Sequence, residues 1–283
     1  MKKILLIGSS GYIGSYLITK LIHNYQVTGI DQKDSLMDCD NFEFIKSAHQ
    51  NLDEDFFKQF DHVLYFAGIS SVPLANHDPE NTIKENLFDL YELSKKCKQS
   101  HLIYASSGSV YASLHSAESL SFTATENIHN SYDASKLALD LVIDFGGSNY
   151  NALRLGTVSG WSPNLRKELI FNSMCISAIE NGVVNISSPN SYRSILFLDD
   201  LYSIVNHIIT NRPSIKKIPC LSYSGTIGQI GQEIASFFDA KLNISKEVTT
   251  GYSFVLKNAL DDFFPGSSLK IQCNKFRKNY EQS

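Results

Sequence analysis

The sequence predicts an α/β protein: a doubly wound, mostly parallel sheet with a small C-terminal α/β lobe. Short apolar runs alternate with helix-like segments through the first half of the chain, which is typical of a parallel sheet with helices on both faces. A glycine-rich turn directly follows the first apolar run, where such sheets pass from strand to helix. We interpret as buried strands the apolar runs at residues 4–7, 27–30, 42–45, 63–66, 102–105 and 152–155.

Amphipathic segments lie between these runs. Ile13, Leu17 and Leu21 recur at helical spacing, and residues 79–97 form a longer segment of the same kind. We expect the helices to join parallel strands through right-handed connections.

The alternation of strand-like and helix-like segments is less regular in the second half of the chain. Residues 164–182 predict a helix, and residues 194–198 predict a strand that leads into a helix near Asp199. The four residues from Thr226 have the spacing of a capping box, which predicts a helix running to Phe238.

Neither a repeat nor a low-complexity linker separates the two halves. We therefore predict two interleaved parts. The first is an NAD-binding Rossmann domain at residues 1–156, with returning segments from about 190–225, and the second is a small substrate-binding lobe at residues 157–283.

Composition excludes several classes of protein. Hydrophobic residues make up 43% and charged residues 19% of the chain, as in ordinary globular proteins. The net charge of −4 indicates neither a nucleic-acid partner nor an anionic membrane surface. No apolar run approaches the roughly 20 residues that cross a bilayer. The five cysteines stand far apart and the eight histidines lack metal-ligand spacing, so we expect a cytoplasmic protein without a metal.

The glycine-rich turn has the pattern of a dinucleotide-binding loop. Gly8, Gly11 and Gly14 form G-x-x-G-x-x-G between the first strand and the first helix. Glycines let the pyrophosphate approach the backbone, and the helix N-terminus offers it free N–H groups. Asp31 ends the second strand about 20 residues later, where a carboxylate accepts both ribose hydroxyls of the adenosine. No arginine lies beside Asp31 and the nearest cation is Lys33, so we favour NAD over NADP. The alternatives are a plain glycine loop and an aspartate that caps a turn.

Two further motifs predict a catalytic site. Tyr132 and Lys136 share one face of a helix, and a neighbouring ammonium favours the phenolate form of a tyrosine. Lys136 is also expected to bind the nicotinamide ribose. Ser107 follows a buried strand at the carboxyl edge of the sheet, where it can hydrogen-bond a substrate oxygen alongside Tyr132. The alternatives are an ordinary helix surface for the Tyr–Lys pair and a serine-rich loop for Ser107.

The order of these motifs resembles that of the extended short-chain dehydrogenase/reductases, which include the NAD-dependent nucleotide-sugar epimerases and dehydratases. This resemblance implies that residues 66–68 line the nicotinamide side, that Asn86 supports the active site, and that Arg193 contacts the nucleotide diphosphate. A surface salt bridge is the alternative for Arg193.

Three positions depart from the family's pattern. Dehydratases carry Asp-Glu after their catalytic hydroxyl residue, whereas this chain has Gly108-Ser109, so we do not expect elimination chemistry. Ala48 stands where many members hold adenine with an aspartate. Thr157 stands where epimerases often place an asparagine near the substrate phosphates.

The resemblance implies hydride transfer between NAD and a secondary alcohol carbon of a nucleotide-linked sugar. We expect a 4-epimerase. The alternatives are a 4-keto-sugar reductase or dehydrogenase with exchangeable NAD(P)H, and a non-catalytic dinucleotide sensor. The apolar helices at residues 86–97 and 137–145 are similar to the family's dimer helices, which implies a homodimer; the alternative is that these helices only cover the sheet.

The predicted site residues fall into three groups: Ser107, Tyr132 and Lys136 for catalysis; Gly8, Gly11, Tyr12, Ile13, Gly14, Asp31, Gln32, Phe66, Ala67, Gly68, Asn86 and Lys136 for the cofactor; and Ser107, Thr157 and Arg193 for the substrate.

Overall fold

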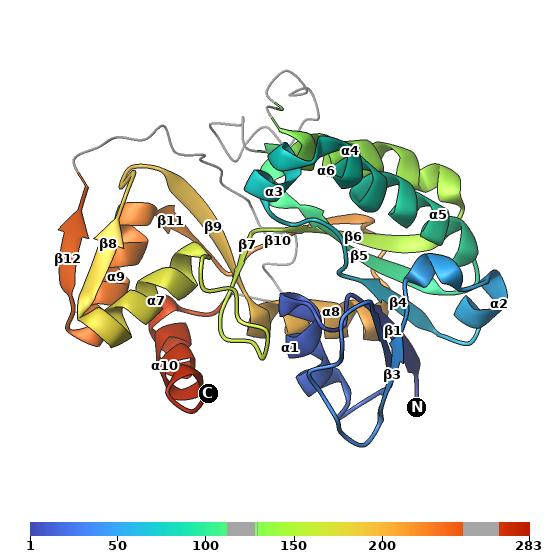
Figure 1. Cartoon of the computed structure of the whole chain (residues 1–283), viewed down its shortest axis with the longest axis horizontal. Helices are drawn as coiled ribbons and strands as arrows, with labels where there is room; N and C mark the ends of the chain where they lie inside the picture. Colours follow the sequence, from blue (N-terminus) through green and yellow to red (C-terminus); the bar gives the residue numbers. More distant parts are fainter. Residues whose placement is uncertain (112–127, 129, 246–265) are drawn as a thin grey trace. The chain divides into compact units, whose positions relative to one another are not determined.

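The computed structural model describes residues 1–111, 128, 130–245 and 266–283, whose elements are labelled in Figure 1. These residues form two compact units. The first comprises residues 1–110, 128, 130–154 and 205–218, and the second comprises residues 111, 155–204, 219–245 and 266–283. The assignment of cofactor binding to one domain and substrate binding to the other stays a prediction.

The central sheet has seven strands in the order β10-β6-β5-β4-β1-β2-β3. β1 pairs in parallel with β2 and β4, β2 pairs in parallel with β3, and β4 pairs in parallel with β5. The chain thus starts in the middle and winds outward on both sides, which confirms the predicted Rossmann fold. The strands are β1 (Lys3–Ile7), β2 (Gln26–Asp31), β3 (Phe42–Lys46), β4 (His62–Tyr65), β5 (His101–Ser107), β6 (Asn149–Leu155) and β10 (Lys217–Cys220).

Each apolar run predicted as a strand coincides with one of these strands. The runs are recognisable because both faces of the sheet are covered (Figure 1). On one face, Leu5 of β1 packs in a buried cluster with Leu90 of α5 (Asp89–Lys96) and Leu139 of α6 (Ser131–Val142). Burial of each such side chain stabilises the fold by about 1.5–3 kcal/mol.

The remaining helical elements of the first unit connect these strands. They are α1 (Tyr12–Leu21), η1 (His49–Asn51), α2 (Glu54–Phe57), α3 (Val72–His77), α4 (Pro79–Ile83), η2 (Lys84–Phe88), η3 (Gly108–Tyr111) and η5 (Ile143–Gly146). The segment 79–97 is not one continuous α-helix, because η2 is a π-helical turn between α4 and α5. Such turns are frequent at functional sites, and this one carries Asn86.

The second unit contains two small sheets. A three-stranded sheet has the order β11-β9-β7, and a two-stranded sheet pairs β12 with β8. The capping box at Thr226 is present at the start of α9, as predicted. The elements are β7 (Thr157–Ser159), α7 (Ile170–Asn181), β8 (Val183–Ile186), β9 (Tyr192–Phe197), β11 (Tyr223–Thr226), α9 (Ile227–Phe238), β12 (Lys241–Ile244) and α10 (Leu269–Tyr280), with α8 (Leu198–Asn211) shared between the units.

The helix predicted at residues 164–182 begins later than expected, at Ile170. The reason is the buried Asn172, whose Oδ1 accepts from the Gly160 N–H at 2.8 Å and whose Nδ2 donates to the Arg166 carbonyl at 2.9 Å. These bonds hold the preceding residues in a loop over the first turn of α7.

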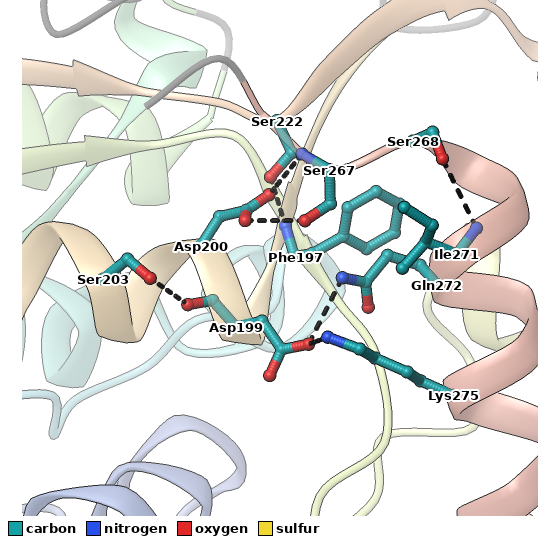
Figure 2. A network of polar contacts seen from close by, with 10 residues as sticks. All are labelled: Phe197, Asp199, Asp200, Ser203, Ser222, Ser267, Ser268, Ile271, Gln272 and Lys275. Carbon is teal, nitrogen blue, oxygen red and sulfur yellow. Dashed lines mark hydrogen bonds and ion pairs between the residues drawn. The ribbon is translucent and has the colours of Figure 1, made fainter. Parts of the chain in front are cut away.

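Asp199 and Asp200 at the start of α8 bind the C-terminal segment of the second unit (Figure 2). The Asp200 carboxylate accepts from the Ser267 N–H at 2.9 Å and from the Ser267 hydroxyl at 2.7 Å. The Asp199 carboxylate accepts from Gln272 at 3.3 Å and from Lys275, both on α10. Adjacent aspartates thus attach two successive parts of the C-terminal segment to α8.

In the part of the chain that the structure describes, no helix combines the length and the apolar character needed to cross a membrane.

Candidate active site

The glycine loop lies between β1 and α1 and makes close backbone contacts. Gly8 has a φ of 85°, and a Cβ at that position would stand 2.7 Å from the Ala67 nitrogen. A Cβ at Gly14 would stand 2.1 Å from the Gly8 carbonyl oxygen. Only glycine fits these two positions, because any side chain would displace the loop or the segment after β4.

This loop fits a dinucleotide. Gly11 is the N-cap of α1 and has no side chain to satisfy the first N–H groups of the helix. Those groups and the positive end of the helix dipole suit a pyrophosphate. Tyr12 and Ile13 form the first turn of α1, as their assignment to the cofactor requires.

Asp31 ends β2 beside the glycine loop. Its Oδ2 accepts from the Ser10 N–H at 3.0 Å, and its Oδ1 accepts from the Lys33 N–H at 3.0 Å. The carboxylate is therefore held against the loop by two backbone donors, and each oxygen keeps a lone pair for a further donor. Gln32 follows Asp31 at the surface. This arrangement suits a ribose, whose hydroxyls can donate to Asp31.

The segment after β4 is tied to the helix that carries Tyr132 and Lys136. Gly68 has a φ of 100°, and a Cβ there would stand 2.5 Å from Asn86 Oδ1. The fully buried Asn86 accepts from the Ile69 N–H at 3.0 Å and donates to the Ile69 carbonyl at 2.9 Å. Its Nδ2 also donates to Ser135 Oγ of α6 at 3.2 Å. Asn86 thus joins residues 66–69 to α6.

Lys136 is buried and points toward β5. Its Nζ donates to the Ala105 carbonyl at 3.1 Å and lies 5.9 Å from the centre of the Tyr132 ring. Burial lowers the pKa of Lys136 to about 8, and the nearby Asp140 carboxylate opposes this shift. The ammonium lies within the range at which a cation interacts with an aromatic ring. The predicted pairing of Lys136 with Tyr132 on one helix face is therefore present.

Ser107, the last residue of β5, is connected to α6 through two polar side chains. Its Oγ lies 2.6 Å from Ser109 Oγ, and the Ser109 hydroxyl is hydrogen-bonded to the Asp133 carboxylate. Asp133 follows Tyr132 directly. Asn130, the N-cap of α6, donates to the other Asp133 oxygen at 2.7 Å and accepts from the Asp133 N–H at 2.8 Å.

The two predicted substrate residues of the second unit lie on its three-stranded sheet. Thr157 pairs with Ile195 across β7 and β9, and Arg193 pairs with Gly225 across β9 and β11. Arg193 donates to the carbonyl of Tyr192 at 2.8 Å. Their role in substrate binding stays a prediction.

Several polar residues of the site were not predicted. Ser109 is hydrogen-bonded to Ser107, Asp133 to Ser109, and Asn130 to Asp133, while Ser135 receives the Asn86 hydrogen bond. Asn130 could have been found from the sequence, because asparagine is a preferred N-cap residue and its side chain accepts from the Asp133 N–H at the start of α6. The loop after Ser107 lacks the Asp-Glu pair of the dehydratases. A carboxylate nevertheless contacts this loop, because Asp133 of α6 is hydrogen-bonded to Ser109.

The fold and these contacts define a protein with a dinucleotide-type glycine loop after β1, a Tyr–Lys pair on α6, and a serine at the end of β5 that is connected to α6. The NAD dependent epimerase/dehydratase family matches residues 4–218, and the chain belongs to this family. This confirms the resemblance found in the sequence, the prediction of an enzyme, and NAD as the cofactor.

Individual proteins similar to this chain include two curated relatives. Protein CapI of Staphylococcus aureus is 28% identical over 244 residues, which is 76% of this chain and 71% of that protein. UDP-glucose 4-epimerase of Pisum sativum is 31% identical over 132 residues, or 39% of this chain and 38% of that protein.

A solved structure with the same fold is UDP-glucuronic acid 4-epimerase from Bacillus cereus, in complex with UDP-glucuronic acid and NAD. It has a TM-score of 0.79, is 20% identical, and matches 99% of this chain and 99% of its own. At this identity the likeness concerns the fold.

Proposed function

We propose that the protein is a nucleotide-sugar 4-epimerase, which oxidises and re-reduces one secondary alcohol carbon of a sugar. The observation that carries the proposal is the side-by-side placement of Lys136 and Tyr132 on α6, with Ser107 connected to the same helix. The 4-epimerase activities of the pea and Bacillus cereus proteins named above favour this reaction over others in the family.

Each residue has a chemical role in this proposal. Tyr132 takes the proton of the sugar hydroxyl and gives it back, Ser107 binds the same oxygen, and the Lys136 ammonium favours the phenolate form of Tyr132. The glycine loop holds the pyrophosphate, and Asp31 accepts from the adenosine ribose. The glycine loop and Asp31 would hold NAD, which when bound would supply hydride transfer at the sugar carbon.

The experiment that tests this proposal is purification followed by assay. The protein should carry stoichiometric NAD and interconvert a pair of nucleotide sugars without added cofactor. A panel of UDP-, GDP-, dTDP- and CDP-sugars in a thermal-shift assay identifies the substrate. Protein that is free of cofactor and turns over only with added NAD(P)H would instead be a 4-keto-sugar reductase or dehydrogenase.

The Tyr132→Phe variant separates an enzyme from a dinucleotide sensor. An enzyme should lose about 10²- to 10⁴-fold in turnover, because it loses its acid–base group. NAD affinity should be preserved. A sensor would be indifferent to the loss of this hydroxyl.

We also propose that the protein is a homodimer. Leu141 of α6 and Phe145 of η5 are 53% and 78% exposed, and Phe88 at the end of η2 is 57% exposed. Large apolar side chains at such exposure favour burial against another protein surface. Leu137, the third apolar residue of this helix face, is already buried within the chain.

A further inference from the structure

The hydrogen bonds between Ser107, Ser109 and Asp133 have a fixed direction. A carboxylate has acceptors only, so Ser109 must donate its single hydroxyl hydrogen to Asp133. Ser109 Oγ can then only accept at its 2.6 Å contact with Ser107 Oγ. The hydroxyl hydrogen of Ser107 is consequently directed at Ser109.

Asn130 keeps the Asp133 carboxylate in this state. Its Oδ1 accepts from the Asp133 N–H at 2.8 Å, which identifies the group that faces Asp133 Oδ2 at 2.7 Å as the amide nitrogen, a donor. Both carboxylate oxygens therefore accept hydrogen bonds. Asp133 and Ser107 are 5% and 6% exposed, so water competes little for these contacts.

Ser107 is left with one free acceptor position. Of its two lone pairs, one accepts from the Ser109 N–H at 3.1 Å, and its own hydrogen is engaged with Ser109. Toward any ligand, Ser107 can accept a hydrogen bond but cannot donate one. A hydroxyl can donate to it, whereas a carbonyl oxygen gains nothing from it.

We propose that Asp133, through Ser109 and Ser107, is an alternative acceptor for the single proton of the reacting sugar hydroxyl, which is otherwise taken by Tyr132. The sugar hydroxyl donates to Ser107, and Ser107 and Ser109 each gain one proton and pass one on. The last proton reaches Asp133 Oδ1, so that both serines are unchanged and Asp133 becomes the neutral acid. The hydride leaves the sugar carbon as in the proposed function, on which this inference rests, and the return step runs in reverse.

Asp133 acts through two other residues and is a positioning residue in this scheme. Asp133 also determines the direction of donation in the series of hydrogen bonds from Ser107 through Ser109 to Asp133. In Asp133→Asn, the Asn130 amide still requires an acceptor, so the new carbonyl oxygen should face Asn130 and the new NH₂ group should face Ser109. Ser109 would then donate to Ser107, and the Ser107 hydrogen would be free to point at the ligand.

Neutron diffraction of the deuterium-exchanged, NAD-loaded protein tests the direction of these hydrogen bonds without any substrate. The expected result is a Ser107 deuteron directed at Ser109 and a Ser109 deuteron directed at Asp133, with both reversed in Asp133→Asn. A Ser109 deuteron directed at Ser107 in the unchanged protein would overturn the proposal. This outcome does not depend on which sugar the enzyme takes, and it is therefore distinct from a failure of the epimerase assignment.

A second measurement tests proton transfer. In the Tyr132→Phe background, where the phenol route is absent, Asp133→Asn or Ser109→Ala should lower the residual turnover by about a further tenfold, at unchanged KM. Infrared difference spectra of NAD-loaded Tyr132→Phe with substrate should show the carbonyl stretch of a protonated carboxyl, which Asp133→Asn removes. Equal residual turnover with and without Asp133, or no such band, would refute the relay.

Discussion

Asn86 and Ser135 are joined by a buried hydrogen bond of 3.2 Å, which links the π-helical turn η2 to the helix that carries Tyr132 and Lys136. The same Asn86 side chain pairs with both backbone groups of Ile69. A single amide therefore holds the segment after β4 and the catalytic helix in one arrangement.

Replacing Asn86 with alanine should affect both stability and cofactor binding. The change leaves the Ile69 N–H and carbonyl without their partner, and each unpaired group of this kind costs about 1–3 kcal/mol when it is buried. Denaturant unfolding and NAD titration measure the two effects. Ser135→Ala is the matched control: it removes the hydrogen bonds of Ser135 with Asn86 and with the Tyr132 carbonyl but keeps the Ile69 pairing, so its effect should be smaller. Equal effects of the two variants would mean that the Ile69 pairing contributes little.

Lys136 should give the enzyme an alkaline limit to its activity. Burial lowers the pKa of this ammonium to about 8, so the folded protein loses the charge at a lower pH than an exposed lysine would. We expect kcat/KM to fall as the pH rises through about 8. In Lys136→Arg the guanidinium stays charged, and the alkaline limit should move to higher pH even if the rate is reduced. An unchanged limit in Lys136→Arg would assign it to another group.

The pair His62 and His101 should make the protein sensitive to acid. Their Nδ1 atoms lie 3.2 Å apart on β4 and β5, an arrangement that two neutral rings can share as donor and acceptor. Burial, with the positive charges of Lys2 and Arg212 nearby, lowers the pKa of His62 to about 3 and that of His101 to about 4.

The direction in which stability changes with pH follows from the difference in histidine pKa between the folded and unfolded states. Below the ordinary histidine pKa of about 6.5, the unfolded chain binds protons that the folded chain does not, so stability decreases as the pH is lowered from about 6.5 to about 3. Each histidine contributes at most about 1.4 kcal/mol per pH unit to this slope. Unfolding curves at several pH values should show a flatter slope in a His62→Gln/His101→Gln protein. The exposed His23→Gln is the control, and an equal flattening in it would contradict the assignment.

Asp200 should hold the C-terminal segment more firmly than Asp199 does. Asp200 accepts two hydrogen bonds from the part-buried Ser267, whereas Asp199 binds Lys275, which is half-exposed. Exposed ion pairs contribute about 0–1 kcal/mol. Limited proteolysis should therefore release the C-terminal helix faster in Asp200→Ala than in Asp199→Ala. The reverse order would assign the main attachment to the ion pair.

The strands and the glycine loop could be predicted because their signals are local. A strand covered on both faces can be recognised as a run of apolar residues. The glycine loop can be recognised because no other residue fits at Gly8 and Gly14. The capping box at Thr226 is local in the same sense. The start of α7 was missed because it depends on Asn172 binding a loop that precedes it.

The polar surroundings of Ser107 could not be predicted for a different reason. Ser109 and Asp133 are 24 residues apart in the sequence, and their contact depends on how β5 and α6 pack. Within Tyr-Asp-Ala-Ser-Lys, Asp133 has the pattern of an ordinary exposed helix residue, yet it is buried. Sequence spacing identifies which residues share one helix face, but not which loop lies against that face.

The exposed apolar residues of α6 and η5 lead to the last prediction, the loss of the dimer in Phe145→Glu. Phe145 is the most exposed of these side chains, so the change should not disturb the folded chain, while a buried carboxylate at a subunit interface is strongly unfavourable. Light scattering after size-exclusion chromatography should give twice the chain mass for the unchanged protein and the single-chain mass for the variant. Ile215→Glu is the control, because Ile215 is also exposed, at 46%, but lies outside these helices. A dimer that survives Phe145→Glu, or one that Ile215→Glu dissociates, would place the interface elsewhere on the chain.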